Sequence, residues 1–253
     1  MPSSLLIAAP PAPYEQKERL YREVRQAEGR WLSDEALRGL PEQAPYPALR
    51  QEWRWRRRSF VRFERYLEYK NRPGAPHRLL DLGCGNGWMS NRLAQYPQRT
   101  VWGMDLNMEE LTQATRVFGR ENLRFIYADV ENSPDLTQSV GTFDYIVLAA
   151  SVQYFPDLTR LLRSLQVLLR PGGEVHLLDS AFYPDESARK AAYQRSEAYY
   201  TRIGVPEMAG HYYHHVWPEA RQLGAENLNA SVKTLFLQQL KWLPPFPWLR
   251  FRF

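Results

Sequence analysis

The fold of this chain is decided by the stretch RLLDLGCGNGW at residues 78–88. A short apolar run contains one acid, Asp81, and three glycines follow within five residues. Residues 88–94 then carry apolar side chains at helical spacing. This order predicts a strand, a tight turn and a helix, and the glycines allow a ligand to lie directly against the backbone of the turn.

The spacing of the glycines indicates which ligand the turn accepts. A dinucleotide-binding turn has G-x-G-x-x-G spacing and holds a pyrophosphate at the helix N-terminus. Here Gly83 and Gly85 fit, but Trp88 occupies the third position, and the glycines instead follow G-x-G-x-G spacing. The carboxylate of Asp81 would repel a pyrophosphate and attract an ammonium group, directly or through water. The turn therefore favours S-adenosylmethionine over NAD.

At these residues the chain resembles the class I S-adenosylmethionine-dependent methyltransferases, whose first motif is matched without a gap by LDLGCGNG at residues 80–87. The resemblance covers about residues 78–180 and includes the run LLRPGG at residues 168–173. It implies an α/β fold with a doubly wound, seven-stranded, mostly parallel Rossmann-like sheet, an antiparallel last strand and an N-terminal helical extension. It also implies S-adenosylmethionine as the cofactor.

The sequence predicts the following division of the chain. Strands are expected at residues 78–82, 100–105, 123–130, 143–150, 174–179, about 227–233 and 248–253, with 235–243 as an alternative to the last one. A loose arm is expected at residues 1–13. Helices are expected at residues 14–28 and 48–70, and a short helix is expected to begin after Ser33 as its N-cap. Residues 1–76 would form the arm and a helical lid. Residues 77–253 would form the methyltransferase domain, in which 181–224 is a lid or substrate insertion.

Acids at the ends of two further strands complete the predicted cofactor site. Asp105 lies 22 residues after Gly83 and can accept hydrogen bonds from both ribose hydroxyls of an adenosine. Asn107 and Glu110 after it form a capping-box pattern. The resemblance implies that Asp129 accepts from the adenine amino group. The predicted cofactor-binding residues are Asp81, Gly83, Cys84, Gly85, Gly87, Asp105, Leu106, Asp129, Val130, Ala149 and Ala150.

Methyl transfer from a sulfonium requires an acceptor atom in line with the methyl group, and a hydroxyl or carbon acid also requires a general base. The base candidates are His214, then His211, and Asp179, with His215 beside them; packing is the alternative role for the histidines. Their irregular spacing and the lack of partner cysteines favour no metal site. The predicted acceptor contacts are Gln153, Tyr154, Tyr183 and Tyr212.

The composition limits the class of protein further. Apolar residues make up 44% and charged residues 24% of the chain, and the net charge of +5 permits an anionic partner without requiring one. Cys84 is the single cysteine, so no internal disulfide can form. The apolar residues 5–9 follow no basic region and are too few for a signal peptide or a membrane span. A cytoplasmic protein without membrane insertion is expected.

One basic stripe leaves the choice of acceptor open. Arg54, Arg58, Arg62 and Arg65 share a helix face, and a solvated face is favoured over a nucleic-acid surface because no RNA-binding module accompanies them. The fourth strand also lacks the Asn- or Asp-Pro-Pro-aromatic motif that many nucleic-acid amino-methyltransferases carry. The preferred function is methyl transfer to a small or medium organic acceptor, at oxygen rather than nitrogen. An RNA methyltransferase and a non-catalytic cofactor-binding scaffold are the alternatives, and the oligomeric state is open.

Overall fold

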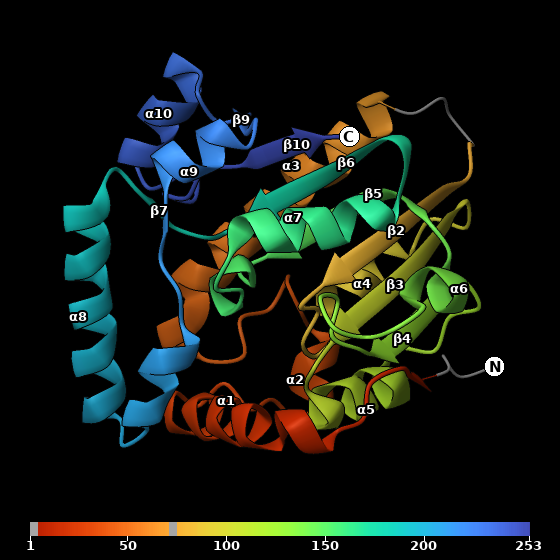
Figure 1. The fold of residues 1–253 in the computed structure, drawn as a ribbon, viewed down its shortest axis with the longest axis horizontal. Coiled ribbons are helices and arrows are strands. Elements are labelled where there is room, and N and C mark those ends of the chain that lie inside the picture. Colours follow the sequence, from red (N-terminus) through yellow and green to blue (C-terminus); the bar gives the residue numbers. More distant parts are fainter. Residues whose placement is uncertain (1–4, 71–74) are drawn as a thin grey trace.

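A computed structural model describes residues 5–70 and 75–253 of the chain, and an eight-stranded sheet forms its centre (Figure 1). The strands run in the order β1 (Leu5–Ile7), β4 (Leu123–Tyr127), β3 (Arg99–Asp105), β2 (His77–Leu82), β5 (Phe143–Ala149), β6 (Leu169–Leu178), β10 (Leu249–Arg252) and β9 (Glu226–Asn227). Pairing is parallel from β1 to β6, and β10 is antiparallel to both of its neighbours. The predicted doubly wound α/β fold is confirmed.

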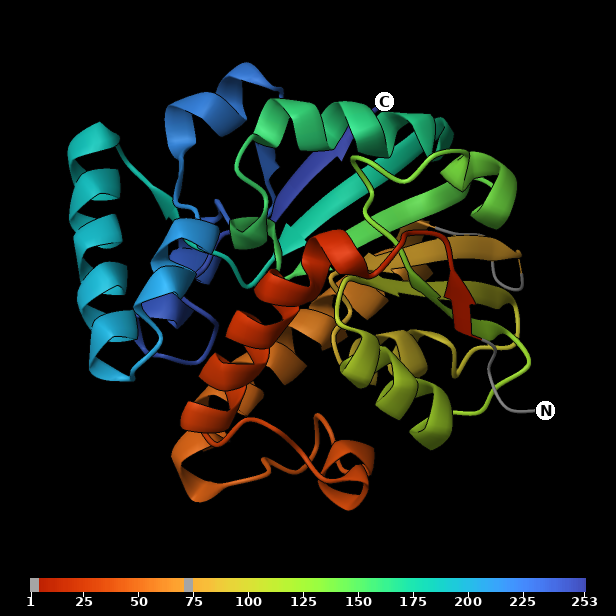
Figure 2. The same ribbon diagram turned by 60° about the horizontal axis from the view of Figure 1, so that its bottom comes forward.

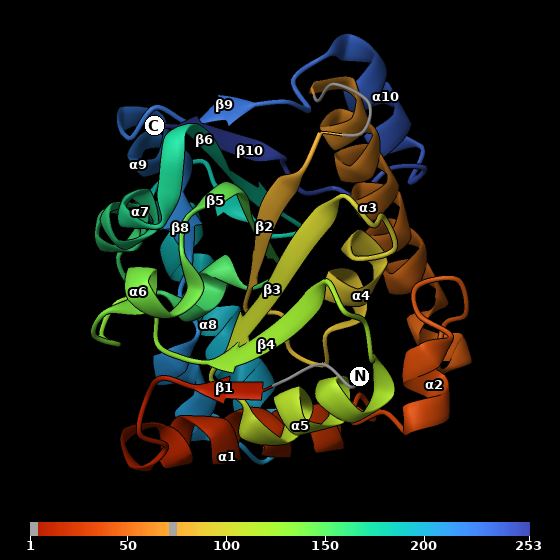
Figure 3. The same ribbon diagram turned by 90° about the vertical axis from the view of Figure 1, so that its right-hand side faces the viewer.

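Helices cover both faces of this sheet (Figure 3). The helices α3 (Arg50–Lys70), α4 (Trp88–Leu93) and α5 (Met108–Val117) pack on one face, and α6 (Leu136–Val140), α7 (Leu158–Val167) and α9 (Trp217–Gln222) on the other. Successive side chains of a strand point to opposite faces, so Leu79 of β2 enters one core and Leu80 the other. A sheet buried on both faces needs apolar residues at consecutive positions, as the central strands have.

The two long amphipathic helices follow the predicted patterns. The stripe of α3 that faces the sheet consists of Trp53, Phe60, Phe63 and Leu67, all buried. In α7 the buried stripe consists of Leu158, Leu161, Leu162 and Leu165, and the helix begins where Asp157 accepts a hydrogen bond from Arg160 N. Burying each such side chain contributes roughly 1.5–3 kcal/mol to stability.

The basic side of α3 is partly covered by the C-terminal segment rather than solvated throughout. The guanidinium of Arg58 lies 5.9 Å from the ring centroid of Trp242 and donates to the backbone oxygen of the same residue. Arg62 lies 5.5 Å from the ring centroid of Trp248. The stripe thus anchors the chain terminus through cation–π contacts, which neither sequence-based interpretation of the arginines anticipated.

A third layer crosses the carboxyl ends of the strands. Figure 2 shows α1 (Glu15–Ala27) lying across this edge beside the 181–224 segment. That segment holds β7 (Phe182–Tyr183), α8 (Glu186–Arg202), the 3-10 helix η4 (Pro206–His211) and β8 (His215–Val216), and β7 pairs with β8 as a separate parallel ribbon. Leu20 and Val24 of α1 pack with Tyr200 and Met208 in a small core of their own.

Short elements complete the chain. They are α2 (Asp34–Arg38), α10 (Val232–Gln239) and the 3-10 helices η1 (Ala12–Tyr14), η2 (Pro47–Leu49) and η3 (Val152–Tyr154). Ser33 caps α2 as predicted, by accepting from Ala36 N at 3.2 Å. No helix within residues 5–70 or 75–253 combines the length and the apolar character that crossing a membrane would require.

The expectations for both ends of the chain need correction. Residues 1–4 of the predicted arm lie outside the described residues, and the rest is not loose throughout, because Leu5–Ile7 forms β1 and pairs with β4 at the edge of the sheet. Within the described residues, the main sheet therefore has eight strands instead of the predicted seven. The strand predicted near 227–233 is reduced to the two residues of β9, and Ser231 then caps α10 by accepting from Thr234 N. The alternative strand at 235–243 is therefore wrong, whereas the terminal strand is confirmed as β10.

Candidate active site

The glycine turn joins β2 to α4 at the carboxyl edge of the sheet. Gly83, Gly85 and Gly87 have φ values of +72°, +51° and +74°, a region that residues with a side chain adopt only at a cost. A Cβ at Gly83 would lie 2.4 Å from Cβ of Ser151, and a Cβ at Gly87 would lie 2.7 Å from the ring of Phe125. The turn therefore needs glycine both for its backbone shape and for its close packing.

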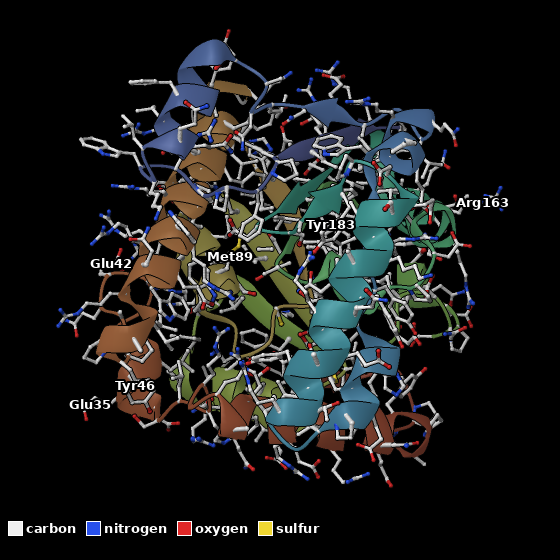
Figure 4. All side chains as sticks on the ribbon, turned by 90° about the vertical axis from the view of Figure 1, so that its left-hand side faces the viewer. Glu35, Glu42, Tyr46, Met89, Arg163 and Tyr183 are labelled. Carbon is white, nitrogen blue, oxygen red and sulfur yellow. The ribbon has the colours of Figure 1, made fainter. Side chains whose placement is uncertain are left out.

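Two adjoining cavities lie above this turn. The larger has a volume of about 540 Å³ and the smaller about 190 Å³. Four residues line both of them: Gly83 and Ala150 at the strand ends, and Tyr21 and Tyr154 opposite. The larger cavity opens between α3 and α8, where Met89 and Tyr183 are seen in Figure 4. The two cavities therefore share a boundary at Gly83 and Ala150.

The smaller cavity carries the residues expected to hold an adenosine. Asp105, Leu106, Asp129 and Val130 all line it. Asp105 accepts hydrogen bonds from Gly85 N at 2.7 Å and Asn107 N at 2.9 Å, so its carboxylate is fixed in orientation. Burial raises its pKa, and the backbone donors act in the opposite direction. Each carboxylate oxygen can accept a second hydrogen bond, which leaves both available to a diol.

Asp129 is held by its own set of donors. Its Oδ2 accepts from Tyr14 OH at 2.9 Å and from Asn132 Nδ2 at 2.7 Å, and its Oδ1 accepts from Glu131 N at 2.8 Å. Tyr14 precedes α1, so this hydrogen bond ties the N-terminal region to a residue that lines the cavity. The contact joins the segment before α1 to the loop that follows β4.

Asp81 lies beneath the larger cavity, 2% exposed, and accepts from Ser90 Oγ at 2.7 Å. Burial raises the pKa of Asp81 to about 7, and the nearby charge of Asp105 adds to the rise. A buried carboxyl group with one neutral donor gains stability as an anion when a cation binds beside it. The position and chemistry of Asp81 thus suit an ammonium group.

Two residues with a side chain adopt positive φ next to each other at the strand ends. These are Ala150, with φ +55°, and Asp179, with φ +54°. Ala150 N donates a hydrogen bond of 2.9 Å to the backbone oxygen of Leu178, the residue before Asp179. Ser59 donates a hydrogen bond to Asp179, and burial raises the pKa of Asp179 to about 6. Such backbone conformations cost of order 1–3 kcal/mol each and concentrate at functional sites.

The predicted acceptor contacts all line the larger cavity, namely Gln153, Tyr154, Tyr183 and Tyr212. Gln153 is fixed at both ends of its amide: Nε2 donates to Ala150 O at 2.5 Å, and Oε1 accepts from Ser180 Oγ at 3.1 Å. Tyr154 meets Tyr21 and Tyr212 edge to face, with ring centroids 5.7 and 5.9 Å apart. The wall is therefore rigid and aromatic, with hydroxyl groups at its edges.

The histidines lie behind this wall and do not line either cavity. His214 Nε2 is 3.1 Å from Ser196 Oγ, and its ring meets Tyr183 and Tyr212 edge to face. His211 ends η4, and burial lowers the pKa of both His211 and His214. His215 is buried, and its Nε2 lies 3.2 Å from Val152 O. Only Asp179 among the base candidates faces the larger cavity directly.

Glu110 and Arg25 are two of the charged residues at the larger cavity that the sequence analysis did not place there. Glu110 completes a capping-box pattern, but only half of the box forms: Asn107 Oδ1 accepts from Glu110 N at 2.9 Å, while the Glu110 carboxylate turns into the cavity wall. It lies 3.9 Å from Arg25 of α1. Arg25 shares one face of α1 with Tyr21, Val24 and Glu28, all of which line the cavity, and this i, i+3, i+4, i+7 spacing was the available signal.

The carboxylates that line the two cavities fit S-adenosylmethionine, the cofactor that the sequence indicated. Acids stand at the ends of three successive strands of the sheet, β2, β3 and β4, and Gly83 of the glycine turn lines both cavities. Within the described part of the chain, no group of three or more His, Cys, Asp or Glu side chains is placed to hold a metal ion. The site therefore matches an adenosine with a cationic tail.

Comparison with known proteins supports the same assignment. Residues 79–173 match a family model described as a methyltransferase domain. Malonyl-[acyl-carrier protein] O-methyltransferase of Halalkalibacterium halodurans is 36% identical over 112 residues, which cover 44% of this chain and 41% of the relative. Trans-aconitate 2-methyltransferase of Deinococcus radiodurans is 35% identical over 127 residues, covering 44% and 45%. The chain thus spans less than half the length of these curated relatives.

Among solved structures, magnesium protoporphyrin IX methyltransferase of Synechocystis PCC 6803 with bound SAH shares the fold. The two superpose with a TM-score of 0.52 at 15% identity, over 82% of this chain and 84% of the other. Residues 79–173 are therefore similar to a methyltransferase domain, for which S-adenosylmethionine is the cofactor, and the solved structure shares the fold of the chain.

Proposed function

We propose that the protein transfers the methyl group of S-adenosylmethionine to an oxygen atom of a small or medium organic acceptor bound in the larger cavity. The observation that carries this proposal is the shared boundary of the two cavities at Gly83, Ala150, Tyr21 and Tyr154. Adenosine in the smaller cavity would send its methionine tail across Gly83. The reactive end of the cofactor would then face the larger cavity and its aromatic wall.

For methyl transfer, the main task of the protein is to hold the acceptor oxygen in line with the methyl group of the cofactor. The bound cofactor supplies a methyl group on a positively charged sulfur, which leaves with the bonding electrons as a neutral thioether when the acceptor oxygen attacks. Gln153, held at both ends by Ala150 and Ser180, and the hydroxyl groups of Tyr154, Tyr183 and Tyr212 are placed to orient the acceptor. Holding reactants in line supplies much of the rate enhancement of such a displacement.

An acceptor hydroxyl must also lose a proton, and we assign the base to Asp179. It faces the larger cavity, it receives a hydrogen bond from Ser59, and its pKa of about 6 leaves it ionised at neutral pH while still able to take a proton. His214 would act through Ser196, which lines the cavity, and would position groups rather than touch the acceptor. His211 would have a supporting role in the same wall. An acceptor that binds as a carboxylate would need no base.

The covering elements would act as a lid. Tyr21 of α1 and Tyr199 and Tyr212 of the 181–224 segment form much of the roof of the larger cavity. A roof built from helices outside the nucleotide fold lets acceptor recognition vary independently of cofactor binding. One relative named above is an O-methyltransferase of malonyl-[acyl-carrier protein] and the other a methyltransferase of trans-aconitate, and the name of the first supports oxygen as the acceptor atom.

The test is methyl transfer itself. The purified protein would be incubated with S-adenosylmethionine and a panel of dicarboxylates, phenols and fatty acids. The release of S-adenosylhomocysteine would be measured for each acceptor. An oxygen acceptor should turn over, and D179N should lose most of the activity on a hydroxyl acceptor and little on a carboxylate. Turnover with amines alone, or with bulk RNA alone, would contradict the proposal.

A further inference from the structure

Arg25 is an unusual cation within the larger cavity. Its side chain is 17% exposed, its Nε is buried without a hydrogen-bond partner, and the carboxylate of Glu110 is 3.9 Å from its nearest terminal nitrogen. The Oε2 of Glu110 is also buried without a partner, in a side chain only 4% exposed. Unpartnered atoms on two buried charged groups are costly, so this arrangement is incomplete without a ligand.

The other arginines that line this cavity either pair with carboxylates or are exposed to solvent. Arg30 donates to both carboxylate oxygens of Glu52 and lies 3.3 Å from Glu28, and Arg56 donates to Glu52 at 3.0 Å. Arg195 of α8 is exposed at the mouth. Among the described residues that line the cavity, Arg25 is therefore the buried cation whose guanidinium lacks a close carboxylate.

Arg25 and Glu110 also stand beside the glycine turn. A Cβ at Gly85 would lie 3.0 Å from Oε2 of Glu110, and Gly85, Asp81, Glu110 and Arg25 all line the same cavity. The methionine end of S-adenosylmethionine carries one ammonium and one carboxylate. Asp81 supplies an anion for the ammonium, and a cation is then needed on the opposite side of the tail.

We propose that Arg25 of α1 binds the α-carboxylate of the cofactor's methionine moiety, exchanging its loose contact with Glu110 for a direct, charge-assisted pair. The planar guanidinium suits a carboxylate because two parallel N–H groups can donate to its two oxygens. The helix α1, which lies outside the glycine-turn motif, would thereby bind the amino-acid end of the cofactor. The proposal rests on the cofactor assignment and adds a residue to it.

The environment of Glu110 favours this exchange. Burial raises the pKa of Glu110 to about 7, while Arg25 acts to lower it. A carboxyl group that is partly protonated near neutral pH is a weak competitor for the guanidinium. The fully ionised α-carboxylate of the cofactor replaces it without leaving a buried negative charge, because Glu110 can take up a proton.

The experiment compares two ligands that differ only in the carboxylate. Calorimetric titrations would use S-adenosylhomocysteine and its decarboxylated counterpart, S-adenosyl-3-thiopropylamine, with the full chain. In the wild-type protein, loss of the carboxylate should weaken binding about 10- to 100-fold, the range expected for a charged hydrogen-bond partner. In R25M this difference should fall to less than about threefold, through weaker binding of S-adenosylhomocysteine alone.

Arg22→Met is the matched control. Arg22 lies one turn earlier on α1 and also pairs with a glutamate of α5, Glu109, but at the exposed surface. R22M removes an α1–α5 ion pair without touching the cavity, so it should keep the full discrimination between the two ligands. If R25M is poorly folded, R25M/E110Q removes both buried charges together and should show the same lost discrimination.

The results separate cleanly. Equal binding of both ligands to the wild-type protein, or equal weakening of both in R25M, would overturn the role of Arg25 and leave the cofactor assignment intact. A raised KM for the acceptor with unchanged S-adenosylhomocysteine affinity in R25M would instead place Arg25 with the acceptor, which also contradicts the proposal. Failure of the wild-type protein to bind S-adenosylhomocysteine at all would contradict the cofactor assignment, and with it the proposal that rests on that assignment.

Discussion

Gly83 lies against Ser151 so closely that a Cβ on the glycine would come within 2.4 Å of Cβ of the serine. Ser151 in turn donates to Leu82 O at 2.7 Å, which ties the end of β5 to the end of β2. The two strand ends therefore meet with a bare backbone between them. The contact leaves no room for a side chain at Gly83, which lines both cavities, so the fold and the site both depend on it.

Gly83→Ala should impair both stability and cofactor binding. The substitution adds a clash with Ser151 to the strain of an alanine at φ +72°, and a loss of about 2–4 kcal/mol in the free energy of unfolding is expected. Chemical denaturation measures it. Gly172→Ala is the control, because Gly172 has φ +78° but nothing within 4 Å of its Cβ position. An equal loss in both variants would show that backbone strain alone accounts for the effect.

Asp105→Asn should abolish tight cofactor binding while keeping the fold. The amide oxygen can still accept one backbone hydrogen bond, but the charge and half of the acceptor capacity for the ribose hydroxyls are lost. We expect at least tenfold weaker binding of S-adenosylhomocysteine in calorimetry, with an unchanged circular dichroism spectrum. The N-cap variant S33A, at the helix α2, which lines neither cavity, should bind normally. Normal binding by D105N would contradict the assigned role.

Cofactor affinity should rise with pH through neutrality. Burial raises the pKa of Asp81 to about 7, so below that pH the group is mostly neutral and must lose a proton to pair with the ammonium. S-adenosylhomocysteine affinity should therefore fall by up to tenfold per pH unit below about 7 and level off above it. D81N should bind more weakly, with a flatter profile. An identical slope in D81N would show that a group other than Asp81 causes the pH dependence.

The stability of the unliganded protein should depend on pH in the opposite sense. The folded-state pKa values of Asp81, Glu110 and Asp179 lie above their ordinary values, at about 7, 7 and 6. Between about pH 4 and 7 the folded protein binds more protons at these groups than the unfolded chain, so their contribution to stability decreases as pH rises. Denaturation midpoints over this range should show a decline that is reduced in D81N/D179N. A decline of the same size in that variant would contradict the assignment.

The sequence predicted the central part of the fold because its signals are local. The glycine turn, the apolar runs of β2 and β5 and the leucine stripe of α7 each fix a structure by their own periodicity and turn chemistry. The acids at the strand ends could be placed for the same reason. Parallel strands bring their carboxyl ends to one edge, so Asp81, Asp105 and Asp129 had to meet there.

The missed features depend on tertiary contacts. The three residues of β1 are too few to show a period, and only pairing with β4 makes them a strand. Glu110 satisfies a capping-box pattern, yet its carboxylate lies in the cavity wall 3.9 Å from Arg25, a contact between distant segments that no local pattern encodes. The histidines are placed behind Tyr183 and Tyr212 by the fold of the 181–224 segment, which the spacing of His211 and His214 could not reveal.

A crystal structure of the protein with S-adenosylhomocysteine tests the central claim most directly, because that claim is that the two cavities form one site across Gly83 and Ala150. The ribose is expected on Asp105 in the smaller cavity, with the thioether sulfur beyond Gly83 and facing the acceptor wall. Density for the nucleoside confined to the larger cavity, or an empty Asp105 in crystals soaked with the ligand, would contradict the account.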